Sequence, residues 1–210
     1  MSDHPAATPE FWNERWAQDQ LGFHEGAPNR QLVALWPGLR AGKRVLVPLC
    51  GKSHDLEWLA GQGHEVVGVE LSPLACAAFF AERGLTPTVT SEGRYTRYRH
   101  GAVTILQGDI FDLEGEFDAL WDRAALIALP APVRVRYAKL VREHVRGAML
   151  IIAIVYDQQK RDGPPFSVPD DEVRRLHPDA TMVERETVDE ERWRAIGKVE
   201  NVAWQRLPQG

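Results

Sequence analysis

Two acidic residues stand where apolar runs of the sequence end. Glu70 closes the run at 66–69, and Asp109 follows a second apolar segment at 103–107. A carboxylate at the carboxyl end of a strand can accept hydrogen bonds from the two hydroxyl groups of a ribose. The second carboxylate could accept a hydrogen bond from an adenine amine while Ile110 packs on the ring. This pattern predicts recognition of an adenosyl group.

The loop that precedes Glu70 narrows the choice of ligand. An apolar run at 45–49 ends in Cys50 and Gly51, and Glu70 follows about 20 residues later, the spacing of a ribose-binding acid. Gly51 is the single glycine of this loop, so the G-x-G-x-x-G pattern that lets a pyrophosphate approach the backbone is missing. An adenosyl ligand without a pyrophosphate fits better, and S-adenosylmethionine is the obvious one. An NAD-dependent oxidoreductase is disfavoured for the same reason.

Each of these residues also has a plain structural interpretation. An acid such as Glu70 after a strand most often caps a helix or stays solvated, and Asp109 could equally cap the turn that follows it. Trp12 and Trp16 lie one helical turn apart, and their spacing alone favours a stripe that faces the core. As a lid, the Trp12 indole could instead cover a sulfonium, because a cation is attracted to an aromatic face.

Composition limits the class of protein. With 210 residues, of which 44% are hydrophobic, the chain suits a single domain over residues 1–210. The net charge of −5 gives no general attraction to nucleic acid or to an anionic membrane. Cys50 and Cys76 are too few for a disulfide framework, and no paired Cys or His spacing resembles a metal site. No apolar run approaches the roughly 20 residues that span a bilayer. We expect a cytoplasmic, metal-free monomer.

Strands and helices alternate along most of the chain. Residues 148–155 form the most apolar run and predict a central strand that is buried on both faces. Alternating side chains on either side of Gly101 predict a hairpin, and two late strands without a clear helix between them predict an antiparallel hairpin at one edge. The order predicts an α/β fold with a seven-stranded, mostly parallel, doubly wound sheet. The expected strands are 45–49, 66–69, 103–107, 117–121, 148–155, 181–188 and 199–207.

The first 40 residues precede this sheet and carry helical signals of their own. Thr8 and Pro9 combine a capping hydroxyl with a proline at the first helical position, and residues 31–36 resume a helical pattern. We expect residues 1–40 to form an N-terminal helical lid.

Several short strings, all in the same order, resemble the thiopurine S-methyltransferase family. The loop string at 48–52 is distinctive, because it replaces the glycine-rich loop usual in class I methyltransferases. The resemblance covers nearly the whole chain, and the short N-terminus resembles the bacterial members. The strings are FWNERW at 11–16, GFH at 22–24, PLCGK at 48–52, GHEVVGVE at 63–70, IFDL at 110–113, WDRAAL at 121–126 and GPPF at 163–166.

The resemblance implies a Rossmann-like class I methyltransferase that uses S-adenosylmethionine, and it implies roles for particular residues. Trp193 and Ile196 depart from the animal-type pattern of the family. The implied cofactor-binding residues are Trp12, Leu49, Glu70, Asp109, Ile110 and Arg123; Phe23 and Arg192 are implied on the substrate side, and Arg123 and Arg192 are the implied catalytic residues.

The implied reaction is methyl transfer to the sulfur of an aromatic or heterocyclic thiol such as a thiopurine. Arg123 or Arg192 could hold the thiolate or orient a water molecule. Two alternatives stay open: methylation of selenium or tellurium oxyanions or another soft nucleophile, as in metalloid detoxification, and a non-catalytic adenosyl-binding subunit that regulates a partner. In each enzymatic case the partner is a small molecule.

Overall fold

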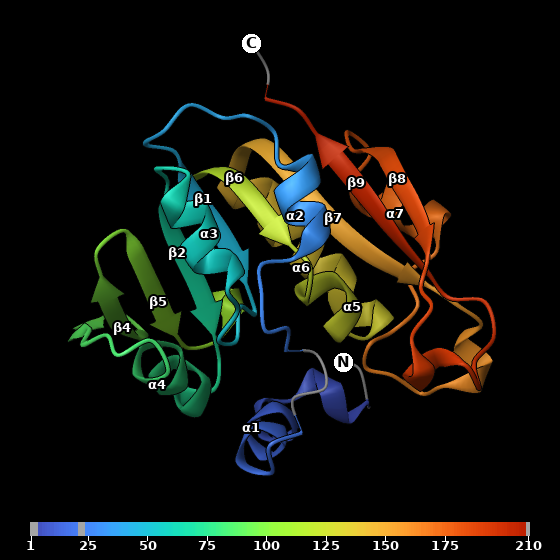
Figure 1. The fold of residues 1–210 in the computed structure, drawn as a ribbon, viewed down its shortest axis with the longest axis horizontal. Helices are drawn as coiled ribbons and strands as arrows, with labels where there is room; N and C mark the ends of the chain where they lie inside the picture. Colours follow the sequence, from blue (N-terminus) through green and yellow to red (C-terminus); the bar gives the residue numbers. More distant parts are fainter. Residues whose placement is uncertain (1–3, 21–23, 209–210) are drawn as a thin grey trace.

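The computed structural model describes residues 4–20 and 24–208 (Figure 1). A nine-stranded sheet runs through this part of the chain. The strands are β1 (Arg44–Pro48), β2 (Glu65–Glu70), β3 (Thr88–Glu92), β4 (Tyr95–His100), β5 (Val103–Gln107), β6 (Phe117–Asp122), β7 (Val145–Val155), β8 (Thr181–Thr187) and β9 (Glu200–Arg206). Their spatial order is β3-β4-β5-β2-β1-β6-β7-β9-β8.

The centre of the sheet is parallel and both of its margins are antiparallel. Strands β5, β2, β1, β6 and β7 run in one direction, while β9 runs antiparallel to β7 and pairs with β8. At the other margin β4 pairs antiparallel to β5, and β3 to β4. The expected α/β fold, with seven mostly parallel strands and an antiparallel hairpin at one edge, is confirmed, and β3 and β4 extend it.

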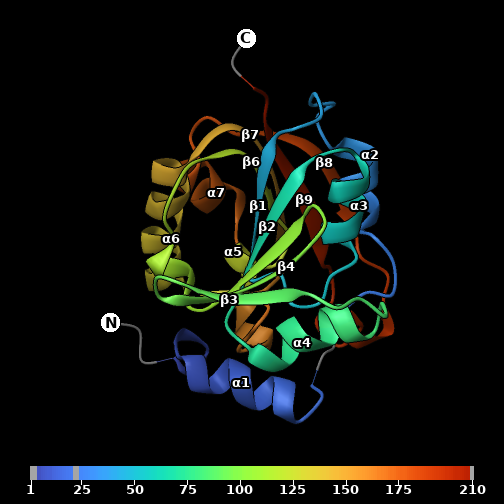
Figure 2. The same cartoon turned by 90° about the vertical axis from the view of Figure 1, so that its left-hand side faces the viewer.

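Helices cover both faces of the sheet. Figure 2 shows α6 and α7 on one face and α2 and α3 on the other. The α-helices are α1 (Pro9–Ala17), α2 (Arg30–Leu35), α3 (Asp55–Gly61), α4 (Pro73–Ala81), α5 (Ala125–Ala128), α6 (Ala131–His144) and α7 (Asp170–Leu176). Short 3₁₀ turns are η1 (Pro5–Ala7), η2 (Ile110–Asp112), η3 (Gln158–Lys160) and η4 (Glu191–Trp193).

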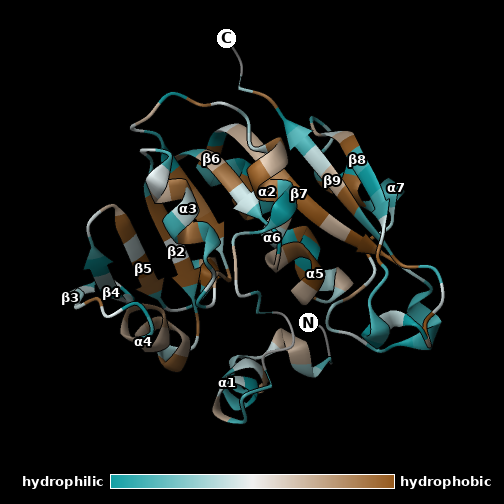
Figure 3. Ribbon diagram, viewed as in Figure 1, coloured by the Kyte–Doolittle hydropathy of each residue, from teal (hydrophilic) through white to brown (hydrophobic). Residues whose placement is uncertain are grey.

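Two hydrophobic cores lie on opposite sides of the sheet because successive side chains of a strand alternate between faces. In β1, Leu46 belongs to the core beneath α6, whereas Val45 and Val47 belong to the core beneath α3 and α4. Burial on both faces explains why the central strands are almost continuously apolar (Figure 3). The sheet is therefore a rigid support whose strand ends hold their positions.

The N-terminal helix lies across one edge of this support. Thr8 accepts a hydrogen bond from the Phe11 N–H and Pro9 opens α1, as the sequence predicts. In Figure 1, α1 lies below the sheet, near the carboxyl ends of the parallel strands. Among the described residues, no helix has the length and apolar character needed to cross a membrane.

Candidate active site

A cavity of about 860 Å³ opens at the carboxyl ends of the parallel strands. This volume lies within the range of small-molecule binding sites, which is about 300 to 1,000 Å³. Its wall is formed by α1, by the loops that follow β1, β2, β5 and β6, and by the segments around η3 and η4. The strand ends therefore meet at one site, as expected for an open α/β sheet.

The loop after β1 turns sharply into this cavity. Leu49 has a φ of +49° and Gly51 a φ of +52°, so two residues close together take the left-handed conformation. For a residue with a side chain such as Leu49, this conformation costs about 1–2 kcal/mol. Strain of this kind concentrates at ligand sites, where the surrounding structure holds it in place. The turn brings the Gly51 N–H to the end of β2.

Glu70 receives that N–H. Its Oε2 accepts a hydrogen bond from the Gly51 N–H at 2.8 Å, and its Oε1 accepts one from the Ser72 N–H at 2.8 Å. The side chain is buried, and burial raises the pKa of the carboxyl while the surrounding backbone N–H groups oppose that rise. Each carboxylate oxygen has a further lone pair, so the group can still accept hydrogen bonds from a ligand.

Asp109 occupies the equivalent place after β5. Its Oδ1 accepts a hydrogen bond from the Phe111 N–H at 3.0 Å, which caps η2, and its carbonyl accepts one from the Tyr95 hydroxyl at 2.7 Å. Asp109 therefore caps the turn that follows it, which is the structural role that its position in the sequence predicts. It also lines the cavity beside the buried Ile110, so capping does not withdraw it from the site.

The two arginines expected at the site line the same cavity. Arg123 follows β6 and donates a hydrogen bond from Nη2 to Glu25 Oε1 at 2.7 Å. Arg192 lies in η4, where its Nε is 2.6 Å from Glu190 Oε2 and half of its side chain is exposed. Each guanidinium is thus held by a carboxylate at the wall of the cavity, a geometry that fixes its direction.

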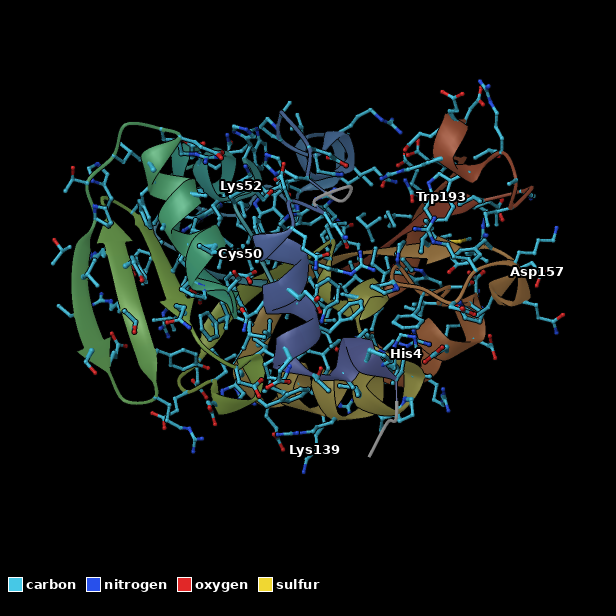
Figure 4. The ribbon with its side chains drawn as sticks, turned by 90° about the horizontal axis from the view of Figure 1, so that it is seen from below. His4, Cys50, Lys52, Lys139, Asp157 and Trp193 are labelled. Carbon is cyan, nitrogen blue, oxygen red and sulfur yellow. The ribbon has the colours of Figure 1, made fainter. Side chains whose placement is uncertain are left out.

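Helix α1 contributes residues to the wall of the cavity. Trp16 is buried against the loop after β1, where a Cβ on Gly51 would lie 3.2 Å from its Cζ2. Trp12 lines the cavity and donates a hydrogen bond from Nε1 to the Ala6 carbonyl at 3.1 Å. In Figure 4, α1 crosses the molecule beside the loop that carries Cys50. The two indoles therefore have different environments rather than forming one core stripe.

Comparison with known proteins identifies the family. A family model described as thiopurine S-methyltransferase matches residues 7–205. The chain belongs to the thiopurine S-methyltransferase family. A relative from Bordetella petrii that carries this name is 48% identical over 190 residues, which cover 85% of this chain and 87% of the relative. Since this family uses S-adenosylmethionine, the chain is an S-adenosylmethionine-dependent methyltransferase, as the sequence predicts.

Solved structures agree with this fold. The 1,6-didemethyltoxoflavin-N1-methyltransferase of Burkholderia thailandensis has a TM-score of 0.62 at 18% identity, covering 98% of this chain and 93% of that chain. The magnesium protoporphyrin IX methyltransferase of Synechocystis PCC 6803 has a TM-score of 0.58 at 13% identity, covering 93% of this chain and 84% of that chain. At these identities the likeness shows the fold alone.

The residues that line the cavity have the chemical groups needed to bind the adenosyl cofactor of the thiopurine S-methyltransferase family. The cavity joins a buried carboxylate with free acceptor positions to apolar walls, which suit a ribose and an adenine ring. The structure brings to this cavity all of the expected site residues that it describes, and Phe23 lies outside the described residues. The residues brought together are Trp12, Leu49, Glu70, Asp109, Ile110, Arg123 and Arg192.

A buried carboxyl group, that of Asp122, lies at the end of β6; the sequence places it at a strand end beside Arg123 but predicts no role for it. Asp122 accepts hydrogen bonds from the Tyr137 hydroxyl at 2.6 Å and from the Ala125 and Leu126 N–H groups at 2.9 and 3.2 Å. Burial raises its pKa to about 6, against these hydrogen bonds. The network fixes the strand end from which Arg123 extends. An acid at the end of an apolar run was the available signal, but Tyr137 belongs to a separate helix.

Proposed function

We propose that the chain methylates the sulfur of aromatic or heterocyclic thiols, thiopurines among them. The observation that carries this proposal is a single cavity that combines the Glu70 carboxylate with the guanidinium groups of Arg123 and Arg192. The name of the family supports a thiopurine acceptor. Methyl transfer between two sulfur atoms needs no protein nucleophile. This agrees with a cavity whose charged groups and apolar walls can bind and orient the two reactants.

In this proposal the cofactor half of the site is built around Glu70. Its carboxylate binds the ribose hydroxyl groups, while Asp109 and Ile110 hold the adenine. Leu49 presents the strained loop to the cofactor, and Trp12 covers the sulfonium, because a cation is attracted to the face of an indole. When bound, S-adenosylmethionine supplies a methyl group on a positively charged sulfur. Residues 1–40 serve as the lid through α1.

The acceptor half depends on the two arginines. Arg123 and Arg192 bind the thiolate and direct its sulfur toward the methyl carbon, and Phe23 packs on the acceptor ring. With the cofactor bound, methyl transfer to the thiolate would form one C–S bond as the other breaks, the electron pair would stay on the cofactor sulfur, and the thiol proton would already have been lost to water. Opposite charges are neutralised in this step, so a cavity that α1 shields from water favours it.

Incubation of the purified chain with methyl-labelled S-adenosylmethionine and 6-mercaptopurine tests the proposal. We expect the label in the S-methylated purine. Selenite and tellurite, assayed in parallel, reveal whether another soft nucleophile is the better acceptor. Tight binding of the cofactor without turnover of any thiol would instead indicate a regulatory subunit.

Substitutions can separate the two halves of the site. Glu70→Ala should mainly weaken the binding of S-adenosylhomocysteine, because it removes the acceptor for the ribose hydroxyls. Arg192→Ala should mainly lower kcat/KM for the thiol, because it removes a group that holds the thiolate. Calorimetric titration and initial rates measure these effects, and the reverse pattern would contradict the assignments.

A further inference from the structure

The acceptor side of the cavity contains two guanidinium groups beside one indole. The Cζ of Arg161 lies 4.7 Å from the centre of the Trp193 ring, and the Cζ of Arg192 lies 5.7 Å from it. All three residues line the cavity. Contacts of this kind are attractive because the ring face carries negative charge. The Trp193 ring therefore helps to keep the two guanidinium groups at the wall of the cavity.

Trp193 is itself firmly placed. Its side chain is 3% exposed and belongs to a small core with Ile154 and Ile196. The ring of Tyr156 lies 5.5 Å from it, centre to centre. In Figure 4, Trp193 is labelled on the same side of the molecule as Asp157. The Trp193 ring therefore gives the Arg161 guanidinium a fixed surface. Arg161 itself lies outside the regular elements, directly after the short η3 turn.

Arg161 and Arg192 differ in their charged partners. Arg192 is paired with Glu190 at 2.6 Å. Within residues 4–20 and 24–208, Arg161 forms no ion pair with a carboxylate, and its guanidinium contacts the Trp193 ring. Asp157, an acid near Arg161 in sequence, instead accepts a hydrogen bond from the Gln159 N–H at 3.2 Å. Arg161 therefore lines the cavity with no ion pair to offset its charge in the described part of the chain.

We propose that Arg161 binds an anionic group of the acceptor, and that the preferred acceptors are aromatic thiols that also carry a carboxylate. This inference rests on the proposed function and names the class of its substrate. A guanidinium that lies on an indole keeps its N–H edge available, and that planar edge matches the two oxygens of a carboxylate. Arg161 is then a specificity residue, and Trp193 orients it.

A plainer role would be to cover the indole on the surface, and this role predicts no preference for charge. The two roles differ in the ratio of kcat/KM for 4-mercaptobenzoate to kcat/KM for 4-mercaptobenzamide, which is a neutral acceptor of the same shape. With Arg161→Met, the thioether can still contact the indole but the N–H donors are lost. We expect this ratio to fall roughly tenfold, mostly through KM, because the variant loses a charge-assisted hydrogen bond; a tenfold change corresponds to about 1.4 kcal/mol. With Arg161→Lys, which keeps the charge but not the planar edge, the fall should be smaller.

Arg174→Met is the matched control. Its guanidinium lies 5.2 Å from the centre of the Trp204 ring, but neither residue lines the cavity. The ratio should therefore stay at the wild-type value in this variant. Circular dichroism confirms that each variant is folded. If Arg161→Met and wild type give the same ratio, the inference is overturned.

A binding measurement separates this inference from the proposed function. Absence of turnover of both thiols by the wild type would contradict the proposed function. Calorimetric titration with benzoate and benzamide still decides the role of Arg161, because it needs no methyl transfer. Benzoate affinity that falls in Arg161→Met but not in Arg174→Met supports the inference. Equal benzoate affinity in all three proteins overturns it.

Discussion

Glu70 combines a structural task with its proposed ligand-binding task. Its carboxylate holds the Gly51 and Ser72 N–H groups, which fixes the loop after β1 and the start of the segment after β2. These backbone donors oppose the effect of burial on its pKa, so they favour the ionised form that a ribose requires. A change at this residue must therefore alter both the shape of the loop and the affinity for the cofactor.

Glu70→Gln should weaken the binding of S-adenosylhomocysteine by roughly tenfold or more, because a charged acceptor is replaced by an amide that can accept through one atom only. The free energy of unfolding should fall by about 1–3 kcal/mol, since one buried N–H group loses its acceptor. Calorimetry and urea unfolding measure the two effects. Glu65→Gln is the control, because Glu65 begins the same strand but is exposed and does not line the cavity. Unchanged affinity would argue against the ribose role.

The sequence predicted the candidate residues that follow apolar runs and line the cavity, but not the features that depend on distant partners. Glu70 and Asp109 were visible because Glu70 ends β2 and Asp109 follows the end of β5 by two residues. The positive φ of Leu49 could not be predicted from the sequence, because leucine rarely adopts this conformation. The pairing of Arg161 with Trp193 joins two separate loops. Only the folded chain brings them together.

Among the elements, apolar strands were predictable and a polar strand was not. The central strands have both faces buried, so their composition reveals them. Strand β3 is exposed at all of its residues and pairs only with β4, so its sequence lacks any alternation of apolar and polar side chains. Helix α5 was also missed, because at Ala125–Ala128 it is too short for a period to be recognised.

The contact between Trp16 of α1 and Gly51 in the loop after β1 joins two elements that are far apart in the chain, so the sequence does not reveal it. Gly51→Ala should push Trp16 away, because the new Cβ would lie 3.2 Å from Cζ2, and it should also strain a backbone at φ +52°. Gly84→Ala imposes the same kind of strain at φ +64° with no atom within 4 Å. Both variants should lose about 1–2 kcal/mol of stability from this strain. We expect only Gly51→Ala to weaken S-adenosylhomocysteine binding as well, measured by calorimetry, and equal affinity in both variants would contradict a role for this contact.

At the scale of the whole molecule, two buried groups oppose each other in their response to pH. Asp122 has its pKa raised by burial to about 6 from an ordinary 3.8, so the fold favours its protonated form. His177 is fully buried, both of its ring nitrogens lack a hydrogen-bond partner, and burial lowers its pKa to about 4 from 6.5. Asp179 raises the pKa of His177, while Arg142 and Arg206 lower it further.

The stability that each group contributes therefore lies in a different pH range. The contribution of Asp122 is fully present below pH 3.8 and is lost as the pH rises through about 6. The contribution of His177 is present above pH 6.5 and is lost as the pH falls through about 4. Between these limits acidification strengthens one contribution and weakens the other, so they partly cancel.

Single substitutions should expose the two contributions. Between pH 6.5 and pH 4, the stability of Asp122→Asn relative to wild type should fall by about 2 kcal/mol, and that of His177→Leu should rise by about 3 kcal/mol. Urea unfolding at pH 6.5, 5 and 4, at constant ionic strength, measures both trends, and comparison with wild type removes the effect of every other titrating group. The opposite signs make the test strict. A general change in packing would lower the free energy of unfolding by the same amount at each pH and would leave its pH dependence unchanged. Curves for the variants that run parallel to wild type would show that neither buried group titrates as its environment requires.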